Sequence, residues 1–181
     1  MKITAVDSAG DLFLVEEMFT QELLLDLSID NIDWQVQGQQ ENFPRGVIDA
    51  NSCPSSHSFY RMAEYLNGAY IETYFTKFFE RDTLLHVPRI WYDQPGFHMK
   101  EHIDGDENPR PDVALQIYLG QNQGQSGTTF YQMDGSERYN FDYNFNTGYL
   151  MQNNKSQLHG VKPNSSAHNR LSLYVGMDFL N

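Results

Sequence analysis

Two histidines and one aspartate are the residues of this chain best suited to metal chemistry. His102 and Asp104 are separated by one residue, and His159 follows later in the sequence. Two imidazoles and one carboxylate can occupy one face of an Fe(II) octahedron, which leaves three adjacent positions for a chelating molecule and dioxygen. In a strand, positions i and i+2 project from the same face, so His102 and Asp104 can hold one ion together.

A second pair of polar residues, Arg170 and Ser172, has the same i and i+2 spacing. A guanidinium fork beside a hydroxyl suits a carboxylate ligand. Apolar and polar residues alternate around this pair and again over residues 113 to 119. The alternation predicts two strands that present polar groups to a common interior.

The rest of the chain supplies the elements that must position these residues. Apolar residues at helical spacing predict helices over residues 12 to 27 and 55 to 66, with Ser55 and Ser56 as caps of the second. Residues 70 to 79 fit either a helix or a strand. Short apolar runs bounded by turn residues then predict antiparallel strands, at residues 84 to 92, 113 to 119, 128 to 132, 149 to 153 and 171 to 179.

Length and charge set limits on the class of protein. The 181 residues suit one domain, with residues 1 to 83 as helical support and a polar loop, and residues 84 to 181 as a β-rich core with the metal site. The formal net charge of -12 disfavours a nucleic-acid partner, because such binding relies on lysine and arginine. A single cysteine, no membrane-length apolar stretch and no apolar leader predict a cytoplasmic protein that does not cross a membrane.

The motifs together carry a family resemblance. The chain resembles the 2-oxoglutarate- and Fe(II)-dependent oxygenases, closest to their prolyl-hydroxylase-like branch, over about residues 84 to 179. That family implies an α+β, mainly β fold, a double-stranded β-helix or jelly roll with supporting N-terminal helices. Ser126 stands where the family often has a second glycine, which affects the local turn. The matching pattern comprises Tyr92, Gly96, Phe97, His102-x-Asp104, Gln116-Ile-Tyr-Leu119, Gly127-Thr-Thr-Phe130, His159 and Arg170-x-Ser172.

The resemblance implies a role for each matching residue. It makes His102, Asp104 and His159 the Fe(II) ligands and the catalytic centre. It makes Arg170 the partner of the distal carboxylate of 2-oxoglutarate, assisted by Ser172. Tyr92 and Tyr118 match positions where the branch places tyrosines that hydrogen-bond this cosubstrate.

The implied reaction consumes O2 and converts 2-oxoglutarate to succinate and CO2, with ascorbate as a supporting reductant. A C–H bond of a peptidyl or free amino-acid side chain, such as proline, would be hydroxylated. The substrate is therefore expected to be a small molecule or a peptide, and the acidic surface favours a basic peptide over an anionic one. Residues 31 to 54, 121 to 127 and 133 to 146 are candidate lids. The sequence does not indicate an oligomeric state.

Two other functions remain open at this stage. His98, Glu101 and His102 match a zinc-hydrolase pattern, which requires a helix so that both histidines face the metal. Pro95, Gly96, Gly105 and Pro109 leave little room for such a helix. Alternatively, the jelly roll is catalytically inactive and serves as a binding or structural module.

Overall fold

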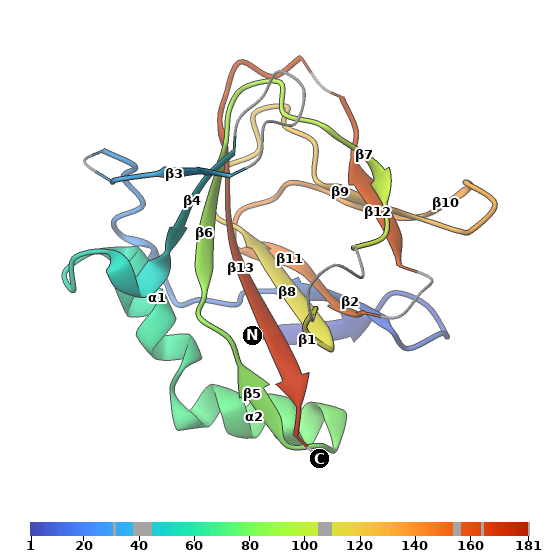
Figure 1. The fold of residues 1–181 in the computed structure, drawn as a ribbon, viewed down its shortest axis with the longest axis horizontal. Coiled ribbons are helices and arrows are strands. Elements are labelled where there is room, and N and C mark those ends of the chain that lie inside the picture. Colours follow the sequence, from blue (N-terminus) through green and yellow to red (C-terminus); the bar gives the residue numbers. More distant parts are fainter. Residues whose placement is uncertain (31, 38–44, 105–109, 154–156, 164, 181) are drawn as a thin grey trace.

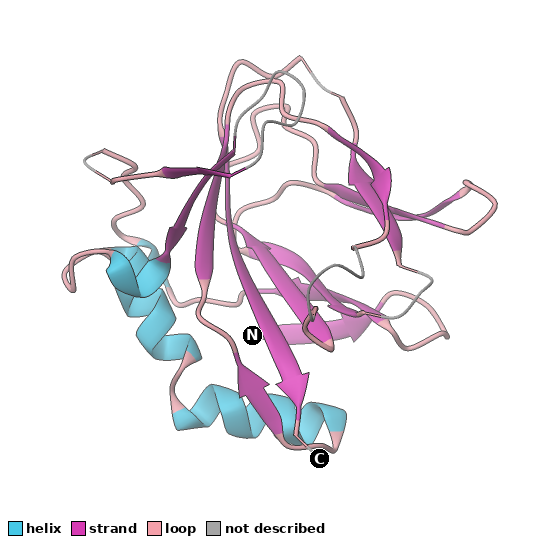
Figure 2. Ribbon diagram, in the orientation of Figure 1, coloured by secondary structure: helices cyan, strands magenta, loops and turns pink. Residues whose placement is uncertain are grey.

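The structure is a computed structural model that describes residues 1–30, 32–37, 45–104, 110–153, 157–163 and 165–180. Within these residues two antiparallel sheets face each other, and two helices cover the outer side of the larger one (Figure 1, Figure 2). The fold is therefore mainly β with supporting helices, as the sequence predicted. No helix in these ranges is both long and apolar enough to cross a membrane.

The larger sheet has the strand order β1-β2-β11-β8-β13-β6-β4-β3, with β5 paired to β13. The smaller sheet has the order β10-β9-β12-β7. The strands are β1 (Lys2–Ala5), β2 (Leu12–Glu16), β3 (Gln35–Gln37), β4 (Arg45–Asp49), β5 (Thr83–Leu85), β6 (Arg89–Asp93), β7 (Met99–His102), β8 (Val113–Tyr118), β9 (Thr128–Tyr131), β10 (Glu137–Phe141), β11 (Thr147–Gln152), β12 (Leu158–Val161) and β13 (Arg170–Phe179).

The helical prediction for residues 55 to 66 is confirmed by α1 (Ser58–Leu66). Its N-cap is His57, whose side chain accepts a hydrogen bond from the Phe59 backbone N–H. The sequence had predicted Ser55 or Ser56 for this role. Residues 70 to 79, for which the sequence allowed two structures, lie in α2 (Ala69–Phe79). The remaining helical turns are 3₁₀ helices over Gln21–Leu24 and Ala50–Ser52.

The helix predicted over residues 12 to 27 is wrong, since this stretch forms β2 and a 3₁₀ turn. The strand β2 lies between two apolar layers. Phe13 and Val15 pack toward the helices, whereas Leu12 and Leu14 pack between the sheets. A strand buried on both faces is a continuous apolar run, which periodicity alone does not separate from a buried helix. Within the described residues, the part of the chain before β5 thus contributes four strands as well as helices.

The alternation predicted for β8 and β13 is confirmed by their packing. Val113, Leu115 and Ile117 pack toward the helices with Leu171, Leu173 and Val175. Ala114 and Tyr118, on the other face of β8, belong to the apolar layer between the two sheets. Polar residues of both strands, Gln116, Arg170 and Tyr174, line a cavity between the sheets together with residues of β7 and β12. The strands β7 and β12 belong to the smaller sheet, which faces the larger one (Figure 1).

Candidate metal and carboxylate site

Two strands of the smaller sheet bring the predicted histidines together. His159 on β12 is the register partner of His102 on β7, and a register irregularity follows between His159 and Val161. Gly160 lies at this irregularity, where a Cβ atom would stand 2.8 Å from the Met99 carbonyl oxygen. A glycine is therefore needed for β7 to approach β12 this closely beside the histidines.

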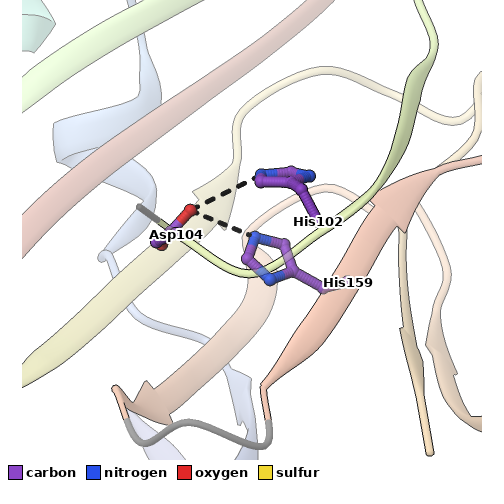
Figure 3. Close-up of side chains that lie close together, drawn as sticks. All are labelled: His102, Asp104 and His159. Atoms are coloured by element: carbon purple, nitrogen blue, oxygen red, sulfur yellow. Dashed lines mark ion pairs between the residues drawn. The ribbon is translucent and has the colours of Figure 1, made fainter. Parts of the chain in front are cut away.

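The three predicted ligands form one compact group (Figure 3). Asp104 Oδ1 lies 3.5 Å from His102 Nε2 and 3.7 Å from His159 Nε2, and the three ligand atoms are all within 4.8 Å of one another. Asp104 follows the end of β7, and its carbonyl oxygen accepts a hydrogen bond from Arg110 Nη1 at 3.0 Å. Two nitrogens and one oxygen converging on one point fit a divalent transition metal such as Fe(II).

The backbone fixes which nitrogen of each ring faces the metal position. His102 Nδ1 donates to the Lys100 carbonyl oxygen and His159 Nδ1 donates to the Gln157 carbonyl oxygen, both at 2.9 Å. A carbonyl oxygen can only accept, so each Nδ1 carries a proton and each Nε2 has a free lone pair. Such second contacts orient metal-ligating histidines. Phe130 stacks against the His159 ring at a centroid distance of 5.3 Å and holds its plane.

The electrostatics of the group differ between the two imidazoles. A hydrogen bond with Asp104 raises the pKa of His102, whereas burial lowers the pKa of His159. Burial acts to raise the pKa of Asp104, but the hydrogen bond with His102 and the positive charges around it bring that pKa below its ordinary value. The carboxylate form of Asp104 is thus favoured, which a metal ligand requires.

Arg170 begins β13 and is almost completely buried, with 2% of its surface exposed. Its Nη1 lies 2.7 Å from Asp93 Oδ2, its Nε donates to the Ser126 carbonyl oxygen at 3.0 Å, and its Nη2 lies 3.4 Å from Thr128 Oγ1. Three partners fix the guanidinium plane, so it is ready to receive a carboxylate without reorganisation.

The metal triad and Arg170 line the same cavity, which has a volume of about 430 Å³. Small-molecule sites typically span about 300 to 1,000 Å³. The wall contains residues of both sheets and of the segments between β7 and β8, which are Arg45, Arg89, Trp91, Met99, His102, Asp104, Arg110, Pro111, Gln116, Thr128, Tyr149, Met151, His159, Val161, Arg170 and Tyr174. One cavity therefore combines three side chains that are able to hold a metal ion with a buried guanidinium group.

The other predicted cosubstrate residues lie in different places. Tyr118 is completely buried beside Arg170, with the guanidinium carbon 5.3 Å from its ring centroid, and donates to Thr128 Oγ1 at 2.9 Å. Ser172 Oγ accepts from Gln116 Nε2 at 3.0 Å. Both side chains therefore act in the polar layer behind the cavity wall.

Tyr92 is on the opposite face of the sheet from the cavity. It is the register partner of Leu171, whereas its neighbours in β6, Trp91 and Asp93, face Ser172 and Arg170. Its ring stacks on Trp34 at a centroid distance of 5.4 Å, and Tyr92 is absent from the cavity wall among the described residues. Because successive strand residues alternate between faces, the expected contact of Tyr92 with a cosubstrate does not fit this structure.

Sequence reasoning missed three polar residues of the site, which are Asp93, Arg45 and Tyr149. Asp93, completely buried, binds Arg170 and also Arg45, whose Nε lies 2.6 Å from Asp93 Oδ1. Tyr149 donates to Gln116 Oε1 at 2.6 Å, and both side chains line the cavity. The alternation of β8 placed Gln116 on the polar face, but no local signal in the sequence indicates the pairing of strands that brings Arg45 to Asp93.

The zinc-hydrolase pattern lacks the structure it requires. Residues Met99–His102 form strand β7, so His98 and His102 do not have the helical spacing that would direct both rings to one ion. Among the described residues, the group able to hold a metal contains His102 without His98 or Glu101. This alternative is therefore wrong.

Comparisons with known proteins agree with the fold. No protein-family model and no curated protein sequence matches this chain. Its structure is similar to a Pseudomonas putida prolyl-4-hydroxylase, with a TM-score of 0.69 and 13% identity over 96% of this chain and 95% of that one. It is also similar to SnoN, a non-haem α-ketoglutarate-dependent epimerase from nogalamycin biosynthesis, with a TM-score of 0.67 and 13% identity over 92% and 77% of the two chains.

A third similar structure is a Trichoplax adhaerens prolyl hydroxylase in complex with a peptide fragment of hypoxia inducible factor. Its TM-score is 0.63 at 12% identity, over 93% of this chain and 83% of that one. This chain therefore has the fold of the 2-oxoglutarate- and Fe(II)-dependent oxygenases, including prolyl hydroxylases, and the jelly roll expected from the sequence is confirmed.

Proposed function

We propose that this protein is an Fe(II)- and 2-oxoglutarate-dependent dioxygenase that hydroxylates a C–H bond of an amino-acid side chain, proline-like in character. The observation that carries the proposal is the presence of the metal triad and the buried Arg170 in the wall of one cavity. When bound, the iron and its cosubstrate would supply the oxidising chemistry, with succinate and CO2 as coproducts.

Each side chain has a distinct part in this proposal. His102, Asp104 and His159 would hold Fe(II) through the atoms that already converge. Arg170 would pair with the distal carboxylate of 2-oxoglutarate, and Thr128, Tyr118 and Ser172 would keep the surrounding polar layer in place. The apolar parts of the cavity wall would exclude water from the reacting atoms.

The test is an anaerobic titration with Fe(II) and 2-oxoglutarate, followed by absorbance. A keto acid chelated to Fe(II) gives a weak visible charge-transfer band, which we expect for the wild type and for His98→Ala. We expect its loss in a His102→Ala/Asp104→Ala variant, and a need for much more 2-oxoglutarate in Arg170→Ala. The His98→Ala control removes a neighbouring histidine that lies outside the triad.

The alternative of an inactive jelly-roll module makes the opposite prediction. It requires that the wild-type protein bind neither Fe(II) nor 2-oxoglutarate, and that it form no succinate in air with ascorbate present. Proline-containing peptides and free amino acids are the first substrates to add, and an increase in succinate formation identifies the class.

A further inference from the structure

The charge of the cavity wall is opposite to that of the whole chain. The protein has a formal net charge of -12, yet four of its seven arginines line this one cavity. They are Arg45, Arg89, Arg110 and Arg170, and Asp104 is the one acidic residue among the described residues of the wall. A cationic cavity in an acidic protein selects anions from solution.

We propose that the primary substrate is a small free carboxylic acid, of the free amino-acid class, and that Arg45 binds its carboxylate. This inference rests on the proposed function and replaces the sequence-based preference for a basic peptide. A residue within a peptide chain has no α-carboxylate to offer, whereas a free amino acid does.

Arg45 is held in place as a binding residue would be. Its guanidinium carbon lies 4.1 Å from the ring centroid of Trp91 and 4.7 Å from that of Phe97. Its Nε and Nη2 donate to the two oxygens of Asp93 at 2.6 and 3.2 Å, and its side chain is 13% exposed. Its remaining nitrogen, Nη1, makes no hydrogen bond within the part of the chain that the structure describes. A fixed guanidinium with a free nitrogen at a cavity wall is prepared to receive an anion.

Arg45 and Arg170 lie on different strands and can each bind a different carboxylate. Register pairing places Arg45 opposite Asp93 on β6, and Asp93 opposite Arg170 on β13, so the two arginines are two strands apart in one row. Arg170 can thus pair with 2-oxoglutarate while Arg45 pairs with the carboxylate of a second molecule. The Asp93 carboxylate accepts hydrogen bonds from both guanidinium groups and so fixes their positions relative to each other.

A count of formal charges supports a second anion. The four arginines are balanced in part by Asp104, by Asp93 and by Asp49, which pairs with Arg89. A divalent metal and the doubly charged cosubstrate cancel each other. Among the described residues one positive charge then remains at the wall, which one substrate carboxylate would neutralise.

Ligand-observed NMR of the Zn(II)- and 2-oxoglutarate-loaded protein tests the inference without turnover, because Zn(II) has no redox chemistry. The probes are matched pairs that differ only in the carboxylate: free L-proline and other free L-amino acids, and the corresponding amides. N-acetyl-L-prolinamide represents a residue inside a peptide. We expect binding by free acids and at least tenfold weaker binding by the matched amides and the blocked compound.

Variants of Arg45 locate the contact. We expect Arg45→Gln to weaken binding of the free acid about tenfold, equivalent to about 1.4 kcal/mol, and Arg45→Lys to weaken it less because the charge is kept. The control is Arg81→Gln, which removes an arginine that also lies over an aromatic ring, 4.3 Å from the centroid of Phe179, but is absent from the described wall of the cavity. The affinity for 2-oxoglutarate, measured in the same samples, shows whether Arg170 is still in place.

Several results would overturn the inference. Amides that bind as tightly as acids, preferential binding of the blocked compound, or an unchanged affinity in both Arg45 variants would each refute it. So would failure of every free acid to bind to protein that binds Zn(II) and 2-oxoglutarate, which would leave the proposed function intact. Failure to bind 2-oxoglutarate at all would refute both.

Discussion

Asp93 and Arg170 form an ion pair that is almost entirely excluded from water, with Arg170 Nη1 2.7 Å from Asp93 Oδ2. The same carboxylate binds Arg45 from the opposite side. A buried charge is tolerated when its partners satisfy it, and removal of one partner leaves the others uncompensated. Asp93 therefore links the stability of the sheet to the positions of Arg45 and Arg170 in the candidate site.

Replacement of this carboxylate should be costly. We expect Asp93→Asn to lower the free energy of unfolding by about 3 to 5 kcal/mol, because the buried Arg170 and the partly buried Arg45 lose their counter-charge. Asp49→Asn is the matched control, since Asp49 pairs with Arg89 across the same two strands but both side chains are 51% exposed. We expect at most about 1 kcal/mol there. Urea unfolding of the wild type and of the two variants measures the difference. An equal loss of unfolding free energy in both variants would contradict the role of burial.

Tyr149 and Gln116, which both line the cavity, are joined by a hydrogen bond, and Gln116 also donates to Ser172 behind the wall. Tyr149→Phe removes the donor to Gln116 Oε1 and frees the amide that also donates to Ser172. We expect a loss of about 1 to 3 kcal/mol in the free energy of unfolding. We also expect severalfold weaker binding of 2-oxoglutarate in the anaerobic titration. Tyr70→Phe is the control, because Tyr70 is 70% exposed, and it should change neither quantity.

We expect the buried hydroxyl of Tyr143 to make the free energy of unfolding depend on pH under alkaline conditions. Its hydroxyl donates to the Leu171 carbonyl oxygen at 2.9 Å and accepts from the Leu171 N–H at 2.7 Å. Burial raises its pKa to about 12, whereas a tyrosine in an unfolded chain titrates near about 10. Between these values the folded chain keeps a proton that the unfolded chain releases, so stability falls as pH rises.

A Tyr143→Phe variant isolates that contribution. At neutral pH we expect it to be about 1 to 3 kcal/mol less stable, since the buried Leu171 N–H loses its partner. The Leu171 carbonyl oxygen still accepts from the Leu119 N–H at 2.9 Å. From pH ~10 to ~12 its stability should fall less steeply than that of the wild type, so the gap between the two proteins narrows. Denaturant unfolding at a series of pH values measures the gap, and a constant gap would show that Tyr143 does not titrate differently on folding.

Cys53 should be a poorly reactive thiol in the folded protein. It is 5% exposed, and burial raises its pKa, so both access and the thiolate fraction are reduced at a given pH. At pH 8.5 we expect alkylation by iodoacetamide to be at least tenfold slower in native protein than in urea. The rates should be compared by mass spectrometry of the single cysteine. Equal rates would mean that the segment opens readily.

The predicted parts of this fold were those that carry a local signal. Alternation identified β8 and β13 and assigned Arg170 and Gln116 to an interior face, and the amphipathic pattern identified α1. The segment at β2 was misread because both of its faces are buried. The strands β3, β4 and β7 were not predicted, because their sequences, Gln-Val-Gln, Arg-Gly-Val-Ile-Asp and Met-Lys-Glu-His, contain too few apolar side chains to show an apolar alternation.

The sequence by itself determined the chemistry available to this protein, since residue type and spacing nominate His102, Asp104, His159 and Arg170 without reference to a fold. Tertiary structure decided which groups meet. Strand register put His159 beside His102 and put Arg45 in the same row as Arg170, and both pairings join segments far apart in the chain. Successive residues of a strand point to opposite faces of a sheet, which is why Trp91 lines the cavity and Tyr92 does not.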